Sequence, residues 1–94
     1  MIIGNKSKKG VSTVGSYTIS YTVNEDGNGN PIEMIGVITS NGTDIGYYNY
    51  KPQGMTGFTI VRTSIVSLND MKALSDQVIL DTRQIFESET IEEG

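Results

Sequence analysis

Tyrosine and carboxylate side chains are the groups in this 94-residue chain best suited to chemistry, because histidine and cysteine are both absent. Without imidazole or thiolate groups, the chain lacks the usual general base at neutral pH, thiol nucleophiles and most transition-metal ligands. Its eleven carboxylate side chains and five tyrosines show no spacing typical of a catalytic acid pair, and no phosphate-binding loop is present. The sequence therefore predicts a protein that is not an enzyme and that holds no cofactor and no metal.

Two short segments resemble ligand-binding loops only in part. Residues 26–30 read D-G-N-G-N, the opening of a calcium loop, but the next position is Pro31 instead of Gly and the twelfth is Val37 instead of Glu. Residues 54–57 have the G-x-x-G spacing of the clamp in KH domains, but they lie between strand-like segments and not between helices. Both segments are predicted to be turns.

The tyrosines are placed in a way that predicts a binding surface. Because side chains alternate along a strand, Tyr47 points to one face of its predicted strand, and Tyr48 and Tyr50 point to the other. One helix covers only one face of a sheet, so the other face is expected to show tyrosine rings with Arg62 beside them. Such a face suits cross-strand packing, contact with a protein, or stacking of nucleic-acid bases.

Alternating apolar residues predict four strands ahead of one helix. The expected strands cover residues 11–23, 32–39, 44–51 and 58–66, and clusters of Gly, Asn and Pro separate them. In the first strand, Gly15 breaks the alternation and predicts a bulge or bend.

The second strand and the turn after it have the most specific local signals among these segments. Apolar residues occupy both faces of the strand over residues 32–39, which predicts a central position in the sheet. The dipeptide Asn41-Gly42 then predicts a two-residue type I′ hairpin turn, because both central positions of that turn need positive φ.

The helix is expected over residues 67–86. Ser67 is a suitable N-cap, Asp70 complements the positive end of the helix dipole, and Val66 with Met71 has the spacing of a hydrophobic staple. Leu80 falls on the polar side of this helix. The apolar stripe predicted to face the sheet comprises Leu68, Met71, Leu74, Val78, Ile79, Ile85 and Phe86.

Together these elements predict an α+β fold, a four-stranded, mainly antiparallel β-meander followed by one C-terminal helix packed on one sheet face. Residues 1–10 are expected to form a flexible basic arm, 11–88 a single β-β-β-β-α domain, and 89–94 an acidic tail. The element order resembles the repeat unit of PUR-type single-stranded nucleic-acid-binding proteins. That resemblance, in element order alone, implies units that pair their sheets and bind single-stranded nucleic acid.

The predicted function is a small non-catalytic binding or adaptor protein acting by stoichiometric interaction, in one form an inhibitor encoded by a phage or mobile element. The chain has a net charge of −4, and its acidic helix would present Asp76, Asp81 and Glu87 to a basic protein partner. Leu80 and the open sheet face predict a homo-oligomer, with a dimer as the first expectation.

Two other functions stay open. One is binding of single-stranded nucleic acid through the tyrosine-bearing face, although the negative charge speaks against nucleic acid as a partner. The other is an oligomeric binder of a small metabolite or nucleotide. The sequence shows neither a signal-peptide pattern nor an apolar run of bilayer length, so a cytoplasmic location without a membrane partner is expected.

Overall fold

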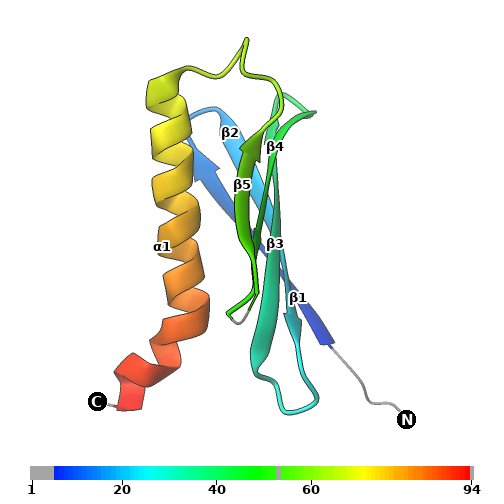
Figure 1. The fold of residues 1–94 in the computed structure, drawn as a ribbon, viewed down its shortest axis with the longest axis vertical. Coiled ribbons are helices and arrows are strands. Elements are labelled where there is room, and N and C mark those ends of the chain that lie inside the picture. Colours follow the sequence, from blue (N-terminus) through cyan, green and yellow to red (C-terminus); the bar gives the residue numbers. More distant parts are fainter. Residues whose placement is uncertain (1–5, 53, 94) are drawn as a thin grey trace.

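A computed structural model describes residues 6–52 and 54–93 of the chain, and it describes side-chain surroundings for residues 8–52 and 54–87. Five antiparallel strands form one sheet in which the spatial order equals the chain order, and helix α1 follows them. The elements are β1 (Lys6–Val14), β2 (Tyr17–Glu25), β3 (Pro31–Ser40), β4 (Thr43–Tyr50), β5 (Thr56–Ile60) and α1 (Leu68–Glu93). Helix α1 packs along one face of the sheet (Figure 1), so the predicted α+β fold is confirmed with one strand more.

The additional strand arises because the segment predicted as one strand over residues 11–23 is a hairpin. Val14 pairs with Tyr17 across a two-residue turn, and Gly15 has a φ of 57°. A positive φ at the first central position is what a type II′ turn requires. Gly15 therefore reverses the chain instead of forming a bulge.

The hairpin also changes the predicted amino-terminal arm. Residues 6–10 belong to β1 and pair with β2, from Lys6 opposite Glu25 to Gly10 opposite Tyr21. Residues 1–5, the rest of that predicted arm, lie outside the described residues.

The predicted fourth strand is shorter and the helix longer than expected. Strand β5 ends at Ile60, and the chain then leaves the sheet through a turn in which the Ile65 amide donates to the Arg62 carbonyl at 3.2 Å. The apolar alternation continues beyond Ile60, but these residues cross from the sheet edge to the helix. Helix α1 extends to Glu93 and so includes residues 89–93, which were expected as a tail; residue 94 lies outside the described residues.

Other local predictions are confirmed. Strand β3 is the central strand, and Asn41 and Gly42 have φ values of 54° and 81°, as a type I′ turn requires. The Ser67 hydroxyl accepts a hydrogen bond from the Asp70 amide at 3.0 Å, which is the expected N-cap. Among the residues that the structure describes, no helix is long and apolar enough to cross a membrane.

A bulge in β4 decides which side chains face α1. Ile38 pairs with Gly46 and Thr39 pairs with Asp44, so Ile45 is an extra residue on β4. Ile45 and Tyr48 stand three positions apart and are both buried, at 0% and 5% exposure. Without the bulge, the alternation of a regular strand would put them on opposite faces.

The helix buries a narrower stripe than the sequence predicts. Leu74, Val78 and Thr82, each four residues apart, are buried against the sheet. Leu68, Ile79 and Ile85, predicted in the stripe, are exposed. Thr82, which falls within the arc predicted to face the sheet, is buried beside the core at 7% exposure. The core comprises Tyr17, Ile19, Tyr21, Val23, Met34, Ile38, Ile45, Tyr48, Val66, Leu74 and Val78.

Candidate functional site

The carboxylate of Asp81 joins the helix to the first hairpin. Its Oδ2 atom accepts hydrogen bonds from the Ser12 and Tyr21 hydroxyls, each at 2.6 Å, and its Oδ1 atom accepts one from the Gln77 amide at 2.8 Å. Burial of Tyr21 first, and then this bond to the Asp81 carboxylate, raise the pKa of the Tyr21 hydroxyl well above its ordinary value. Asp81, predicted to be presented by the helix to a partner, thus faces the sheet of its own chain.

Further tyrosines anchor α1 along the same face. The Tyr17 hydroxyl donates to Asp70 at 2.8 Å, and the Tyr50 ring meets the Phe86 ring edge-on at a centroid distance of 4.9 Å. The hydrogen bond to Asp70 is the main cause of a raised pKa at Tyr17. These contacts, together with Asp81, tie β1, β2 and β4 to α1, so the tyrosines on this face have a structural use.

The Tyr48 hydroxyl is the most deeply enclosed of these polar groups. It lies 2.6 Å from the Thr82 hydroxyl, which in turn donates to the Val78 carbonyl at 2.6 Å. Since Thr82 has a single hydroxyl proton, Tyr48 is the donor to Thr82. Burial is the main cause of a raised pKa at Tyr48.

The other sheet face is uncovered, and Tyr47 is the one predicted interaction tyrosine that lies on it. We define the open face as two rows of cross-strand neighbours that each span all five strands. The first row is Val11, Ser20, Val37, Tyr47 and Thr59, and the second is Lys9, Thr22, Ile35, Asn49 and Gly57.

Small neutral and β-branched side chains dominate the open face. Among its ten residues only Lys9 is charged, and its ammonium group donates to the Thr22 hydroxyl at 3.3 Å. Val11, Ile35 and Tyr47 are 66%, 39% and 44% exposed. The face is therefore flat, nearly uncharged and partly apolar.

The outer side of the helix has the opposite character. Lys72 pairs with Asp76 at 2.9 Å, and Arg83 with Glu87 at 3.5 Å, both as i,i+4 pairs. Leu80 is 48% exposed among these charged residues. Two of the three carboxylates predicted to attract a basic partner thus have a cation of their own chain beside them.

The remaining predicted interaction residue, Arg62, lies away from the helix charges. Its Nε atom donates to the Asp44 carbonyl at 3.1 Å, which attaches the turn after β5 to the start of β4. The side chain is exposed.

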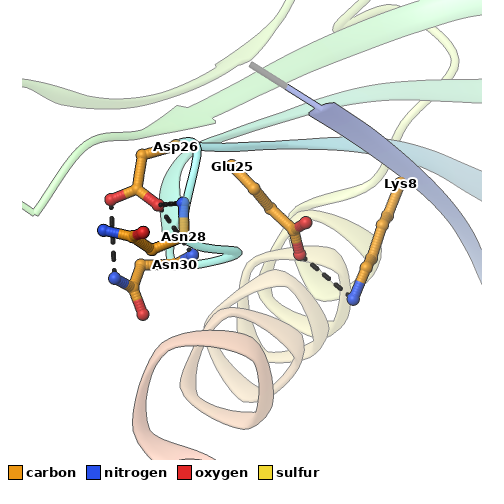
Figure 2. Close-up of polar contacts among 5 residues, drawn as sticks. All are labelled: Lys8, Glu25, Asp26, Asn28 and Asn30. Carbon is orange, nitrogen blue, oxygen red and sulfur yellow. Dashed lines mark hydrogen bonds and ion pairs between the residues drawn. The ribbon is translucent and has the colours of Figure 1, made fainter. Parts of the chain in front are cut away.

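The loop over residues 26–30 is a closed turn. The Asp26 carboxylate accepts the amide protons of Asn28 at 2.8 Å and Asn30 at 3.0 Å (Figure 2). These bonds, that from Asn30 first, lower the pKa of Asp26. The prediction of a turn is confirmed, and in the part of the chain that the structure describes no group of three carboxylates lies close enough to hold a metal ion.

A groove runs between β1 and the second half of α1. Its volume is about 300 Å3, and its lining includes Lys8, Met34, Asp81 and Ile85. Lys8 also forms an ion pair with the buried Glu25 at 3.1 Å (Figure 2). The carboxylate of Asp81 already has three donors, so the groove offers mainly apolar contact.

Comparison with protein-family profiles, with curated proteins and with solved structures finds no match for this chain. The open face itself was recognisable from the sequence only in part. Its residues are those that alternate with the apolar ones, but the rows across the strands depend on the two hairpin turns and on the bulge at Ile45.

Proposed function

We propose that this protein is a small non-catalytic binding module that acts by stoichiometric contact with protein, and that the open face is its contact surface. The observation that carries this proposal is the composition of the face, with one charged residue in ten and with exposed Val11, Ile35 and Tyr47. The cytoplasmic location expected from the sequence is part of this proposal.

The physical basis is the difference between a solvated face and an interface. Surfaces designed to stay in water are given about 25–35% charged residues, whereas the centres of interfaces are depleted of them. On the open face, Val37 and Ile35 of the central strand stand beside Tyr47 of β4. This cluster combines apolar area with a ring of low conformational entropy, which suits contact with another protein.

The helix supports an adaptor function less well. Its exposed pairs, Lys72–Asp76 and Arg83–Glu87, neutralise each other locally, and Asp81 faces inward. Exposed i,i+4 pairs of this kind each contribute only about 0.3–0.5 kcal/mol and are screened by salt. A basic partner would therefore find little uncompensated negative charge on the described part of this surface.

The nucleic-acid alternative loses its stacking platform. Tyr48 and Tyr50 lie on the face covered by the helix, which leaves Tyr47 as the single aromatic ring of the open face, with Lys9 as its single cation. Binding of single strands without sequence preference uses several rings and a positive groove along the backbone. The small-molecule alternative is supported by the groove beside Asp81 and by a second cavity of about 420 Å3, lined by Pro31, Ile32, Lys51, Pro52 and Gly54.

Photo-crosslinking tests the proposal directly. A benzophenone amino acid at Tyr47, which is 44% exposed, is expected to yield one adduct of defined mass in cells that produce the protein. The matched control places the same group at Leu80 on the helix, with 48% exposure, and is expected to yield none. Adducts at Leu80 without adducts at Tyr47, or none at either position, would refute the open face as the contact surface.

A further inference from the structure

We propose that the partner of the open face is the open face of a second copy, so that two sheets pack face to face in a symmetric dimer. This inference rests on the proposed function, because it names the partner of that same surface. Both helices then lie on the outside, with their charged residues in solvent.

The size of the face fits a stable dimer. The whole uncovered side of the sheet adds to the open face the flanking rows that contain Thr18 and Glu33. With five strands about 4.8 Å apart and about eight residues per strand on average, each rising about 3.3 Å, it covers roughly 24 by 27 Å. Burying this face on both copies removes on the order of 1,300 Å2 from solvent, which falls within the range of about 1,200–2,000 Å2 for stable interfaces.

The side chains on the face are suited to another sheet. Two packed sheets lie about 10 Å apart and interdigitate side chains from both inner faces. Ser20, Val37 and Thr59 are small enough for such an approach, and two identical sheets have the same twist. The dimer would also bury the second face of the central strand β3, whose apolar residues occupy both faces.

The charged residues Lys9 and Glu33 both have polar partners within the chain, and that of Glu33 carries the opposite charge. Lys9 lies on the edge strand β1 and donates to Thr22 at 3.3 Å. Glu33, at the end of the neighbouring row, accepts from the Asn24 amide at 3.0 Å and lies 3.8 Å from the Lys51 ammonium. Closing the two faces together therefore leaves Glu33 beside its cation, and the exposed Lys9 ammonium on the edge strand keeps its bond to Thr22.

The position of Glu33 also selects the symmetry axis. An axis parallel to the strands through β3 would bring Glu33 opposite Glu33 of the second copy. An axis across the strands along the row of Val37 instead places Glu33 at the level of Asn41 of the second copy, just past the end of β3, which separates the two carboxylates. This second axis, passing along the row of Val37, also brings Ser20 opposite Ser20 of the second copy.

Sedimentation equilibrium tests the dimer. We expect wild-type protein at about 100 µM to sediment as a dimer, and Ile35→Lys to weaken the dimer by about 100-fold or more, because each copy then buries an unpaired charge. Leu80→Lys is the matched control, since Leu80 is 48% exposed and Ile35 is 39% exposed, and it is expected to leave the dimer intact. Circular dichroism verifies that both variants are folded.

Crosslinking through single cysteines locates the contact. The chain contains no cysteine, so Ser20→Cys gives one reactive site per copy on the open face. A bis-maleimide about 10 Å long is expected to join two copies at this site, matching the spacing of packed sheets. Ala73→Cys, exposed on α1, is expected to give no crosslinked dimer.

The outcomes separate this inference from the proposed function. A monomer at about 100 µM, or a dimer that survives Ile35→Lys, overturns the face-to-face dimer. A monomer whose Tyr47 photo-adduct contains a different protein overturns the dimer and retains the proposed function. An adduct with twice the mass of the chain, lost in Ile35→Lys, supports both.

Discussion

The covered and the open face of the sheet differ in the size of the side chains in adjacent cross-strand rows. On the covered face, one cross-strand row reads Gly10, Tyr21, Gly36, Tyr48 and Phe58, in which glycine and tyrosine alternate over the first four positions. A Cβ atom at Gly36 would lie 3.2 Å from Cε1 of Tyr21, so the glycine makes room for the ring. The open rows on either side hold residues of small to medium size apart from Tyr47 and Lys9.

The difference shows where polar groups are used. On the covered face, the hydroxyls of Ser12, Tyr17, Tyr21 and Tyr48 have partners in the helix. Among the described residues, no buried side-chain nitrogen or oxygen atom lacks a hydrogen bond. On the open face, Ser20 and Thr59 remain exposed. The covered face has more polar side chains, but they bond to the helix. The open face, with fewer polar groups, is therefore the surface proposed for binding.

The largest test of this comparison is a matched pair of truncations on the helix. Leu74→Ala is expected to lower the free energy of unfolding by about 2–5 kcal/mol, because Leu74 is fully buried against the sheet. Ile79→Ala, at 55% exposure, is expected to lower it by less than about 1 kcal/mol. Urea denaturation measures both, and equal losses would show that the helix packs through a different stripe.

A second test uses alkaline pH. The pKa of Tyr21 is raised above the ordinary value of 10.0, so its contribution to stability is fully present below pH 10 and is lost as the pH rises, when the unfolded state releases the proton first. The loss is expected to approach about 1.4 kcal/mol per pH unit for this one group. Denaturation between pH 9 and 11 measures it.

Tyr21→Phe provides the control for that pH series. The variant lacks the proton that the unfolded state releases, so its stability should fall less steeply above pH 10 than that of the wild type. Tyr47→Phe, which keeps the Tyr21–Asp81 bond, should follow the wild-type slope. Identical slopes in all three proteins would contradict the buried bond to Asp81.

The third test compares adjacent residues of β4 that face opposite ways. Tyr48→Phe removes the hydroxyl that bonds Thr82 in the core and is expected to lower the free energy of unfolding by about 1 kcal/mol. Tyr47→Phe removes an exposed hydroxyl and is expected to change it by less than about 0.5 kcal/mol. Thermal unfolding followed by circular dichroism distinguishes the two variants. A larger loss of stability for Tyr47→Phe than for Tyr48→Phe would show that the helix covers the face that bears Tyr47.

Most of the fold could be predicted from the sequence because alternation and turn residues act locally. Asn41-Gly42 and Ser67 each specify a turn or a cap with no help from distant residues. Gly15 predicts a bulge or bend within one strand, because a single glycine in an alternating run fits a local irregularity as well as a reversal of the chain. The choice between them depends on whether β1 and β2 pair, and this pairing involves residues as far apart in the chain as Lys6 and Glu25.

The site was harder to predict because it depends on which face the helix covers. Parity along β4 separates Tyr47 from Tyr48, but nothing in the local pattern says which of them is buried. The bulge at Ile45 aligns Ile45 with Tyr48 on the covered face, and it follows from pairing with β3. Asp81 was assigned outward for a similar reason, since a polar residue beside Thr82 looks solvated until Ser12 and Tyr21 are seen to approach it.

The smallest expected change in the free energy of unfolding is that of a lysine substitution on the open face, and it distinguishes most clearly between an open and a covered face. Ser20 is exposed at the centre of the open face, with Val11 and Val37 as its cross-strand neighbours. Ser20→Lys is expected to change the free energy of unfolding by less than about 0.5 kcal/mol at 1 µM protein, because the ammonium group stays in water. Urea denaturation at this concentration measures the isolated chain.

The same variant becomes informative when the protein concentration is raised. Binding to a second copy stabilises only the folded state, so the wild type is expected to become more stable between 1 and 200 µM, while Ser20→Lys does not. Ala73→Lys, a change on the exposed side of α1, should follow the wild type. A loss of 2 kcal/mol or more for Ser20→Lys at 1 µM would mean that this face is already buried within a single chain, and the contrast between the two faces would then not hold.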